Sequence, residues 1–212
     1  MLRLKNIIRR AINKVLAKFS YISSVATKEK IVYLTFDDGP EPGITEFILA
    51  ELDKYKFKAT FFCRGDNAVK HSYLFSKLRL EGHTIGNHTY SHLNAYKTTA
   101  KEYIEDVKQA DNVLHTSLFR PPHGSLTINS WIKVCPKYKI YFWSLNSNDY
   151  KEENFNLESS MSILQENTQA GDIVLFHFCH KHEKETKKIL PLYLKWLSEN
   201  EFKCGVLMEE KI

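Results

Sequence analysis

The sequence predicts an α/β protein built on a parallel sheet or a barrel. Short apolar runs, typical of buried strands, alternate with longer segments whose apolar residues recur at helical spacing. Polar clusters follow several of these predicted strands directly. Because functional residues of such folds gather at the C-terminal ends of the strands, this placement predicts a site there.

The first predicted units are regular. Residues 31–36 (IVYLTF) form an apolar run that ends in the turn signal DDGPEPG, and residues 44–55 follow with apolar side chains on one helical face. Residues 59–63 (ATFFC) predict a second strand. A helix over residues 67–81 is expected to stop at Gly82.

The second half of the chain repeats this alternation. Residues 84–86 predict a short strand, and residues 100–115 carry a continuous apolar helical stripe. Beyond them the apolar residues predict strands at 118–119, 140–143 and 173–176, and helices at 157–168 and 184–199. Units of this length imply parallel strands.

Composition bounds the class of protein. The chain has 212 residues, of which 43% are hydrophobic and 26% charged, as in one globular domain. Only 8 glycines and 6 prolines occur, which excludes a collagen-like or low-complexity chain. Since no run of about 18 apolar residues is present, no membrane-spanning helix is expected.

The charge is unevenly distributed. The net charge is +5, but residues 1–30 carry eight Lys or Arg and one acid, so the remaining residues are slightly acidic. A slightly acidic body argues against a broad nucleic-acid-binding surface, and no nucleic-acid partner is expected.

Residues 1–26 predict a basic amphipathic helix, because apolar residues recur there at helical spacing between basic ones. Its apolar stripe can pack on the domain or lie on an anionic membrane, and a weak targeting signal is a third interpretation. Basic residues interrupt the place where the apolar core of a signal peptide would lie, so we expect a cytoplasmic protein or one peripheral at the inner membrane face. We assign residues 1–28 to this segment and residues 29–212 to the domain.

The four cysteines lie far apart and form no CxxC pair. This spacing argues against a cysteine zinc cluster, a redox pair or a disulfide scaffold, and predicts free thiols in a reducing compartment. One of the four lies in the segment Cys179-His180-Lys181-His182, which we interpret as a solvated loop rather than a metal site.

Two polar clusters suggest a metal. Asp37 and Asp38 follow the first strand, and adjacent carboxylates repel unless a cation or protons neutralise them. His88 and His92 stand at i and i+4, which on a helical turn puts both imidazoles on one side. Each cluster alone also fits an ordinary turn, but two His and one Asp together make an open site of the catalytic zinc type.

Three further clusters follow later strands. They are Arg120-Pro-Pro-His-Gly124, the segment from Trp143 to Tyr150, and Leu175-Phe-His177. The first alone reads as an ordinary loop, and a histidine that ends a buried strand is usually part of the core. Five polar clusters at strand ends together favour a functional site.

These motifs resemble those of the polysaccharide deacetylase family, the NodB homology domain of carbohydrate esterase family 4. TFDDGP at residues 35–40, HTYSH at 88–92 and LFH at 175–177 match the family's TFDDGP, H[ST]xxH and LxH motifs. RPPHG at 120–124 resembles RxPYG with His123 in place of tyrosine. NSNDY at 146–150 resembles DxxDW with Asn146 and Tyr150 as replacements. The similarity extends over residues 31–207.

The resemblance implies a distorted, incomplete (β/α) barrel of about seven strands and a metal-dependent hydrolase that removes N-acetyl groups from amino sugars. Its partner would be an N-acetylated glycan, either a polysaccharide or an oligosaccharide. Asp38, His88 and His92 would hold one divalent ion, first of all Zn²⁺, although Co²⁺, Ni²⁺ and Mn²⁺ suit the same ligands.

The resemblance also implies roles for the other motif residues. Asp37 would be the general base, His177 the general acid, Arg120 the partner of the base and Asp149 the partner of the acid. A backbone N–H in the loop at Pro122 and His123 would bind the oxyanion, and the acetyl pocket would be lined by Trp143, Tyr150 and Leu175.

Two alternatives stay open. One is an enzyme that removes an acetyl or formyl group from a lipid-linked sugar at the membrane face, suggested by the basic N-terminal segment. The other is an inactive glycan-binding module that keeps the fold.

Overall fold

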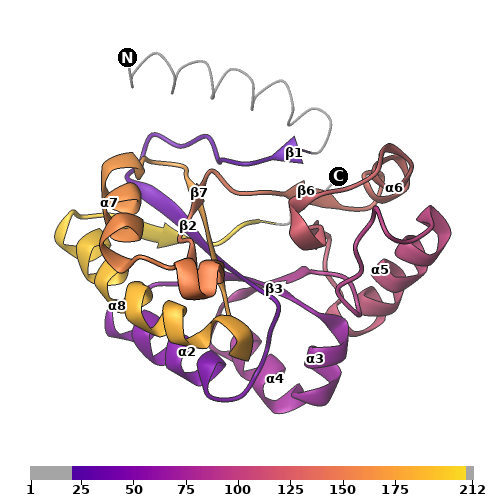
Figure 1. The fold of residues 1–212 in the computed structure, drawn as a ribbon, viewed down its shortest axis with the longest axis horizontal. Helices are drawn as coiled ribbons and strands as arrows, with labels where there is room; N and C mark the ends of the chain where they lie inside the picture. Colours follow the sequence, from indigo (N-terminus) through magenta and orange to yellow (C-terminus); the bar gives the residue numbers. More distant parts are fainter. Residues whose placement is uncertain (1–20, 209–212) are drawn as a thin grey trace.

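The computed structural model describes residues 21–208, which form one curved sheet with helices around it (Figure 1). The sheet has nine strands: β1 (Tyr21–Ile22), β2 (Ile31–Asp37), β3 (Thr60–Cys63), β4 (Thr84–Asn87), β5 (Leu118–Phe119), β6 (Lys139–Tyr141), β7 (Leu145–Asn146), β8 (Ile173–His177) and β9 (Lys203–Gly205). Their order is β1-β6-β5-β4-β3-β2-β8-β7, with β9 also paired to β2.

All these pairings are parallel. Within residues 21–208, the end strands β1 and β7 do not pair with each other, so the barrel stays open. The incomplete (β/α) barrel expected from the resemblance is therefore confirmed. The strands missed in the sequence are β1, β7 and β9, because two or three residues are too few to show a periodicity.

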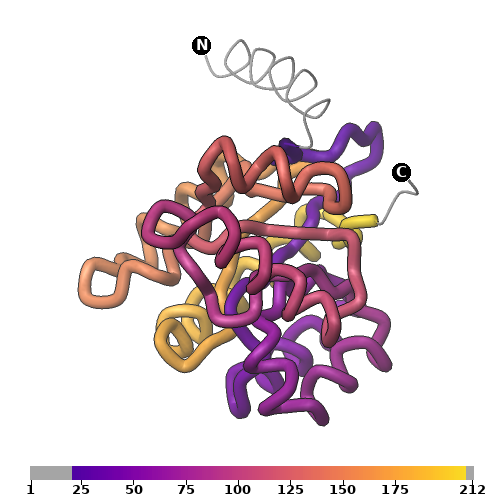
Figure 2. The backbone as a smooth tube through the Cα atoms, turned by 90° about the vertical axis from the view of Figure 1, so that its right-hand side faces the viewer, coloured from indigo at the N-terminus to yellow at the C-terminus, as the bar shows by residue number. Residues whose placement is uncertain are grey.

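Seven α-helices within residues 21–208 connect or cover the strands: α2 (Ile44–Lys54), α3 (Gly65–Lys70), α4 (Ser72–Leu80), α5 (Ala100–Leu114), α6 (Ile128–Val134), α7 (Leu157–Asn167) and α8 (Glu183–Glu199). The single helix expected over residues 67–81 is two helices, α3 and α4, because His71 leaves helical geometry at φ −119° and ψ 49°. Helix α6 was not predicted from the sequence. Figure 2 traces the same backbone turned by 90° about the vertical axis.

The core lies between the central strands and the helices α2 and α8. Phe36 of β2 stacks on Phe61 of β3 at 5.0 Å between ring centroids and lies 5.6 Å from Phe176 of β8. All three rings are fully buried, as is Tyr193 of α8 against Phe176. Burial of each such side chain stabilises the fold by about 1.5–3 kcal/mol, so β2 and β8, which end in two of the polar clusters, are firmly held in the core.

The strand register brings the C-terminal ends of these strands together. Asp37 at the end of β2 pairs in register with Phe62 of β3 and with His177 at the end of β8. Asn87 at the end of β4 pairs with Phe119 of β5. The residues that follow these strand ends therefore converge on one edge of the sheet.

The predicted N-terminal helix lies mostly outside the described residues, and its packing and membrane interpretations stay predictions. Over residues 21–26 the predicted helix is wrong, because Tyr21–Ile22 form strand β1, which pairs with β6. Across residues 21–208 no helix is long and apolar enough to cross a membrane. The four cysteines, all in this range, are free thiols, as predicted.

Candidate active site

Asp37 is held by a buried arginine. The carboxylate accepts a hydrogen bond from Arg120 Nη1 at 2.8 Å, and the same nitrogen donates to Thr35 Oγ1 at 2.8 Å. The rest of the guanidinium donates to the carbonyls of Tyr141 (3.2 Å) and Phe142 (2.9 Å). Arg120 is fully buried, so its charge lies against Asp37 with little screening and fixes the position of that carboxylate.

Asp38 faces two histidines. Its Oδ1 lies 3.0 Å from His92 Nε2 and 3.4 Å from His88 Nε2. His88 Nδ1 lies 2.8 Å from the carbonyl oxygen of Arg120, and because a carbonyl only accepts, Nδ1 carries the proton. With Nδ1 bound to this carbonyl, Nε2 is the nitrogen of His88 that faces Asp38.

Three ligand atoms thus converge on one point, and their chemistry fits a cation. Oδ1 of Asp38 is buried and accepts no hydrogen bond from the residues that the structure describes. Burial alone would raise the pKa of Asp38, but the nearby imidazoles of His88 and His92 outweigh it and hold that pKa well below 3.8. The carboxylate is therefore charged at neutral pH, and the three residues suit a divalent ion as an open three-ligand site.

The segment with the two histidines is a loop, and the expected helical turn is wrong. Thr89 and His92 have φ of 63° and 60°, in the left-handed region, so an α-helical turn cannot run through them. Asp106 of α5 holds this loop by accepting hydrogen bonds from the backbone N–H groups of Tyr90 (2.8 Å) and Ser91 (3.1 Å). The sheet and α5 together aim the histidines at Asp38.

His177 at the end of β8 is oriented by Asp149. Its Nδ1 lies 2.7 Å from Asp149 Oδ1, and its backbone N–H donates to Asp149 Oδ2 at 2.7 Å. The hydroxyl of Thr186 donates to the same Oδ2 at 2.9 Å. Burial alone would lower the pKa of His177, but the charge and hydrogen bond of fully buried Asp149 raise it to about 9. At neutral pH His177 is therefore a cation with a proton to donate.

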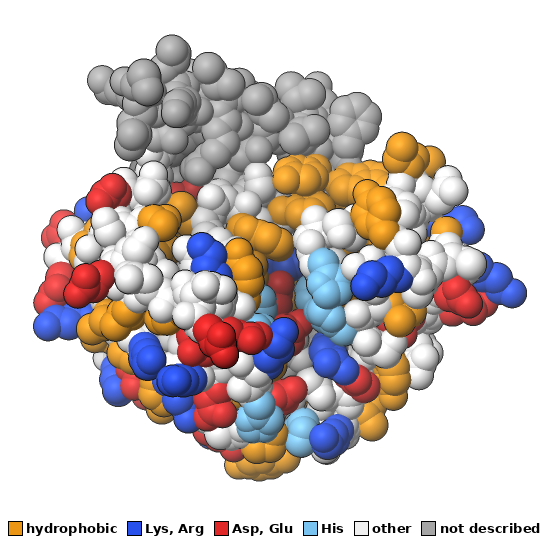
Figure 3. Space-filling model, in the orientation of Figure 1, with side chains coloured by type: hydrophobic (Ala, Val, Ile, Leu, Met, Phe, Trp, Pro, Cys, Tyr) orange, Lys and Arg blue, Asp and Glu red, His pale blue; other side chains and the backbone are white. Residues whose placement is uncertain are grey.

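These groups open onto one cavity of about 820 Å³. Figure 3 shows histidine and acidic side chains around a hollow near the middle of one face. Nine predicted residues line the cavity: Asp37, Asp38, His88, His92, His123, Trp143, Tyr150, Leu175 and His177. Arg120 and Asp149 lie buried behind its wall, and Pro122 is buried in its loop.

Comparisons with known proteins identify the family of this chain. The profile described as polysaccharide deacetylase matches residues 24–139. The chain is 33% identical over 192 residues to a peptidoglycan-N-acetylglucosamine deacetylase of Bacillus cereus, covering 85% of this chain and 90% of that protein. The chain belongs to the polysaccharide deacetylase family.

Solved structures show the same fold. A peptidoglycan N-acetylglucosamine deacetylase in complex with an N-oxidanyl-benzamide compound superposes with a TM-score of 0.84 and 28% identity, covering 91% of this chain and 92% of that one. A carbohydrate esterase family 4 pseudoenzyme from Bacillus anthracis superposes with a TM-score of 0.77 at 22% identity, covering 88% and 67%. Because a pseudoenzyme shares this fold, activity depends on the residues of the site rather than on the fold alone.

The departures from the family motifs are local in this polysaccharide deacetylase. His123, at the tyrosine position, adopts φ 58° and turns its ring edge-on to His92 at 4.7 Å between centroids. Burial, with the nearby His92 and His88, lowers the pKa of His123, so its ring is neutral at pH 7. Tyr150, at the tryptophan position, lies 6.1 Å from the His177 ring and is half-exposed. Both replacements change the cavity wall and leave the buried partners unchanged.

Sequence reasoning missed six residues of the cavity that lie outside the family motifs: Glu41, Arg64, Cys179, His180, Lys181 and His182. The solvated loop expected at residues 179–182 is wrong in part, because Cys179 and His182 are each only 6% exposed. The spacing CxxH was the available signal. Glu41 and Arg64 belong to no motif, and only the folded structure shows that they line the cavity.

Proposed function

We propose that this polysaccharide deacetylase hydrolyses N-acetyl groups on amino sugars of peptidoglycan with the help of one divalent metal ion. The observation that carries the proposal is the convergence of Asp38, His88 and His92 beside a buried, arginine-held Asp37 and opposite a cationic His177. Each of these groups alone is compatible with a structural role, but together they supply a metal site, a base and an acid in one cavity.

The proposed ion is held by Asp38, His88 and His92, with zinc as the first choice because two histidines and one carboxylate are typical of catalytic zinc sites. When bound, it polarises the amide carbonyl and lowers the pKa of water, the two effects that an inert amide needs. The protein's contribution is to orient the ligands. The carbonyl of Arg120 does this for His88 by fixing its tautomer.

Asp37 is the proposed general base. Its Oδ1 is held by Arg120, while its Oδ2 lies 3.9 Å from His88 Nε2, on the side of the metal ligands. A water molecule that attacks the acetyl carbon from this side loses its proton to Asp37. Arg120 acts through Asp37 as a positioning residue, since it is fully buried and does not line the cavity.

His177 is the proposed general acid. Its cationic ring lines the cavity, with Nδ1 held by Asp149, so Nε2 is the nitrogen free to give a proton to the leaving amine. Without that proton the tetrahedral intermediate would expel water rather than the amine. General acid and base groups each contribute about 10²–10⁴-fold to such a reaction.

The remaining cavity residues position the glycan in this proposal. A backbone N–H of the loop at Pro122 and His123 is the proposed oxyanion donor, and Trp143, Tyr150 and Leu175 line the acetyl pocket. Peptidoglycan is the proposed polymer because two relatives that align over at least 85% of this chain and 90% of their own length are described as peptidoglycan N-acetylglucosamine deacetylases.

The test is acetate release from N-acetylated peptidoglycan fragments by the zinc-loaded full-length protein, beside Asp37→Asn and His177→Ala. Both variants are expected to lose most turnover and to keep the metal. Full activity of either variant would contradict its role, and a wild-type protein that binds no metal would favour the inactive glycan-binding alternative. Activity confined to lipid-linked sugars would instead support the membrane-face alternative.

A further inference from the structure

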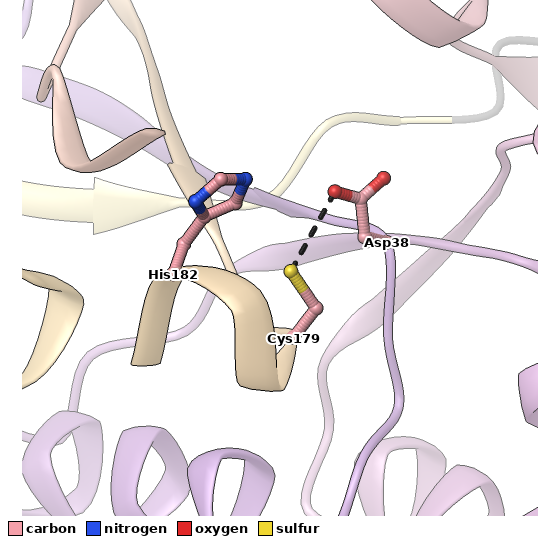
Figure 4. A group of neighbouring side chains, drawn as sticks. All are labelled: Asp38, Cys179 and His182. Carbon is pink, nitrogen blue, oxygen red and sulfur yellow. Dashed lines mark hydrogen bonds between the residues drawn. The ribbon is translucent and has the colours of Figure 1, made fainter. Parts of the chain in front are cut away.

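A second group of potential ligands shares Asp38. Cys179 Sγ lies 3.7 Å from Asp38 Oδ2, and the ligand atoms of Asp38, Cys179 and His182 all lie within 4.8 Å of one another. Figure 4 shows the His182 ring and the Cys179 sulfur turned toward the Asp38 carboxylate from the segment just after β8. None of the family motifs contains Cys179 or His182.

The burial of these side chains indicates a ligand. Cys179 and His182 are each 6% exposed. Nδ1 of His182 is fully buried and has no hydrogen-bond partner within residues 21–208. A buried imidazole without a polar partner is unfavourable, and a metal bond would give the ring a partner.

The chemistry of the group selects zinc. A thiolate, an imidazole and a carboxylate are all ligands that zinc accepts, whereas calcium and magnesium prefer oxygen ligands alone. Zinc bonds of 2.0–2.3 Å at tetrahedral angles require ligand atoms roughly 3.3–3.8 Å apart. The 3.7 Å between Asp38 and Cys179 meets this requirement, and the ligand atom of His182 lies within 4.8 Å of both, so its ring can complete the group by moving closer.

The two groups use different oxygens of one carboxylate. Oδ1 of Asp38 faces His88 and His92, and Oδ2 faces Cys179. Carboxylates bridge metal ions in this way in two-metal sites, where the ions lie about 3.5–4 Å apart. We propose that Asp38, Cys179 and His182 form a second zinc site, and that Asp38 bridges it to the first.

Binding at this site replaces a proton. In the metal-free protein the Cys179 thiol donates to Asp38 Oδ2. When zinc binds, the S–H bond breaks, a zinc–sulfur bond forms, and the proton leaves to solvent. The fourth position of the ion faces the cavity, where a water molecule or a substrate oxygen completes the coordination.

Cobalt(II) tests the proposal, because it replaces zinc and gives a thiolate-to-metal charge-transfer absorption that oxygen and nitrogen ligands do not. The full-length protein, dialysed against Co²⁺, is expected to bind two ions per chain and to show this absorption. Cys179→Ser and His182→Asn are each expected to bind one ion, and Cys179→Ser to lose the absorption. Matched controls are Cys135→Ser, a thiol outside the cavity, and His180→Asn, a neighbour that is 60% exposed.

The double variant His88→Ala/His92→Ala separates the two sites. It is expected to keep one cobalt and the charge-transfer absorption, because the second site needs only Asp38 from the first. If the wild type binds a single ion and this variant loses it together with the absorption, Cys179 is a ligand of the first ion and the proposal is overturned. Absence of the absorption in the wild type overturns it as well.

These readouts do not depend on amide hydrolysis. Asp37→Asn, which removes the proposed base, is expected to keep both cobalt ions, so loss of activity and loss of the second site are told apart. Urea midpoints of the metal-free variants establish that each is folded. If the His88→Ala/His92→Ala variant does not fold, Cys179→Ser, which keeps the size of the side chain, still tests the proposal.

Discussion

Asp149→Asn is expected to move the alkaline limb of the pH–rate profile to lower pH. Asp149 is fully buried, and its Oδ1 lies 2.7 Å from His177 Nδ1. Burial by itself would lower the pKa of His177, and the Asp149 charge raises it to about 9. An asparagine keeps the shape and removes the charge that holds the proton on the imidazole.

The size of the shift follows from these values. If the pKa of His177 falls from about 9 to its ordinary value near 6.5, the imidazolium loses about 3 kcal/mol of stabilisation. Because the pKa is raised, the acid form is present below it and is lost as the pH rises through it. At pH 7.5 the protonated fraction falls from nearly complete to about a tenth, so kcat/KM falls about tenfold. At pH 5.5 the loss from this cause is small.

The assay is acetate release from N-acetylated peptidoglycan fragments between pH 5 and 10, with kcat/KM as the readout because it reports the free enzyme. A metal ion held by Asp38 adds positive charge near His177 in the wild type and in the variant alike. The quantity to compare is therefore the difference in pH between their alkaline limbs. Glu152→Gln, an exposed acid in the same loop, is the control. An alkaline limb that stays in place, or an equal loss at every pH, would refute the role of Asp149.

Three further predictions concern the supports of the site. Arg120→Met leaves the Asp37 carboxylate, 4% exposed, buried without its cation, so we expect a loss of about 3–5 kcal/mol in urea unfolding, and an unchanged midpoint would contradict it. Asp106→Asn weakens the hydrogen bonds that position the loop at residues 88–92, so the zinc affinity measured by titration calorimetry should fall about 10–100-fold. An affinity equal to that of the wild type would contradict this role of Asp106. Gly124→Ala forces a Cβ to 2.5 Å from the Trp143 ring at φ +62°, and a destabilisation of about 1–3 kcal/mol with altered tryptophan fluorescence is expected; wild-type values of both would rule out the clash.

Much of the fold could be predicted because its strands are clear in the sequence. The apolar run before Asp37 and the run before His177 became β2 and β8, whose buried residues need to be hydrophobic on both faces. Strands β1, β7 and β9 are held by pairing with longer neighbours, so their two or three residues show no pattern of their own. The break at His71 is a change of backbone angles that apolar spacing does not record.

The site divides in the same way. Asp37, Asp38, His88, His92 and His177 follow strand ends or lie in short motifs, so the parallel sheet alone predicts that they meet. The backbone of the histidine loop was mispredicted, because Asp106 from α5 sets it through hydrogen bonds at a distance in the sequence. Cys179 and His182 were not recognised as buried residues, because their burial depends on tertiary packing, which the sequence pattern does not record.

The central claim is that Asp38, His88 and His92 hold a divalent ion. Its most direct test is the metal content of Cys179→Ser after dialysis against zinc, since this background leaves only the first site. We expect about one zinc per chain, and none when His88→Ala is added to the same background. A chain that binds no zinc, or that binds it equally without His88, would contradict the account.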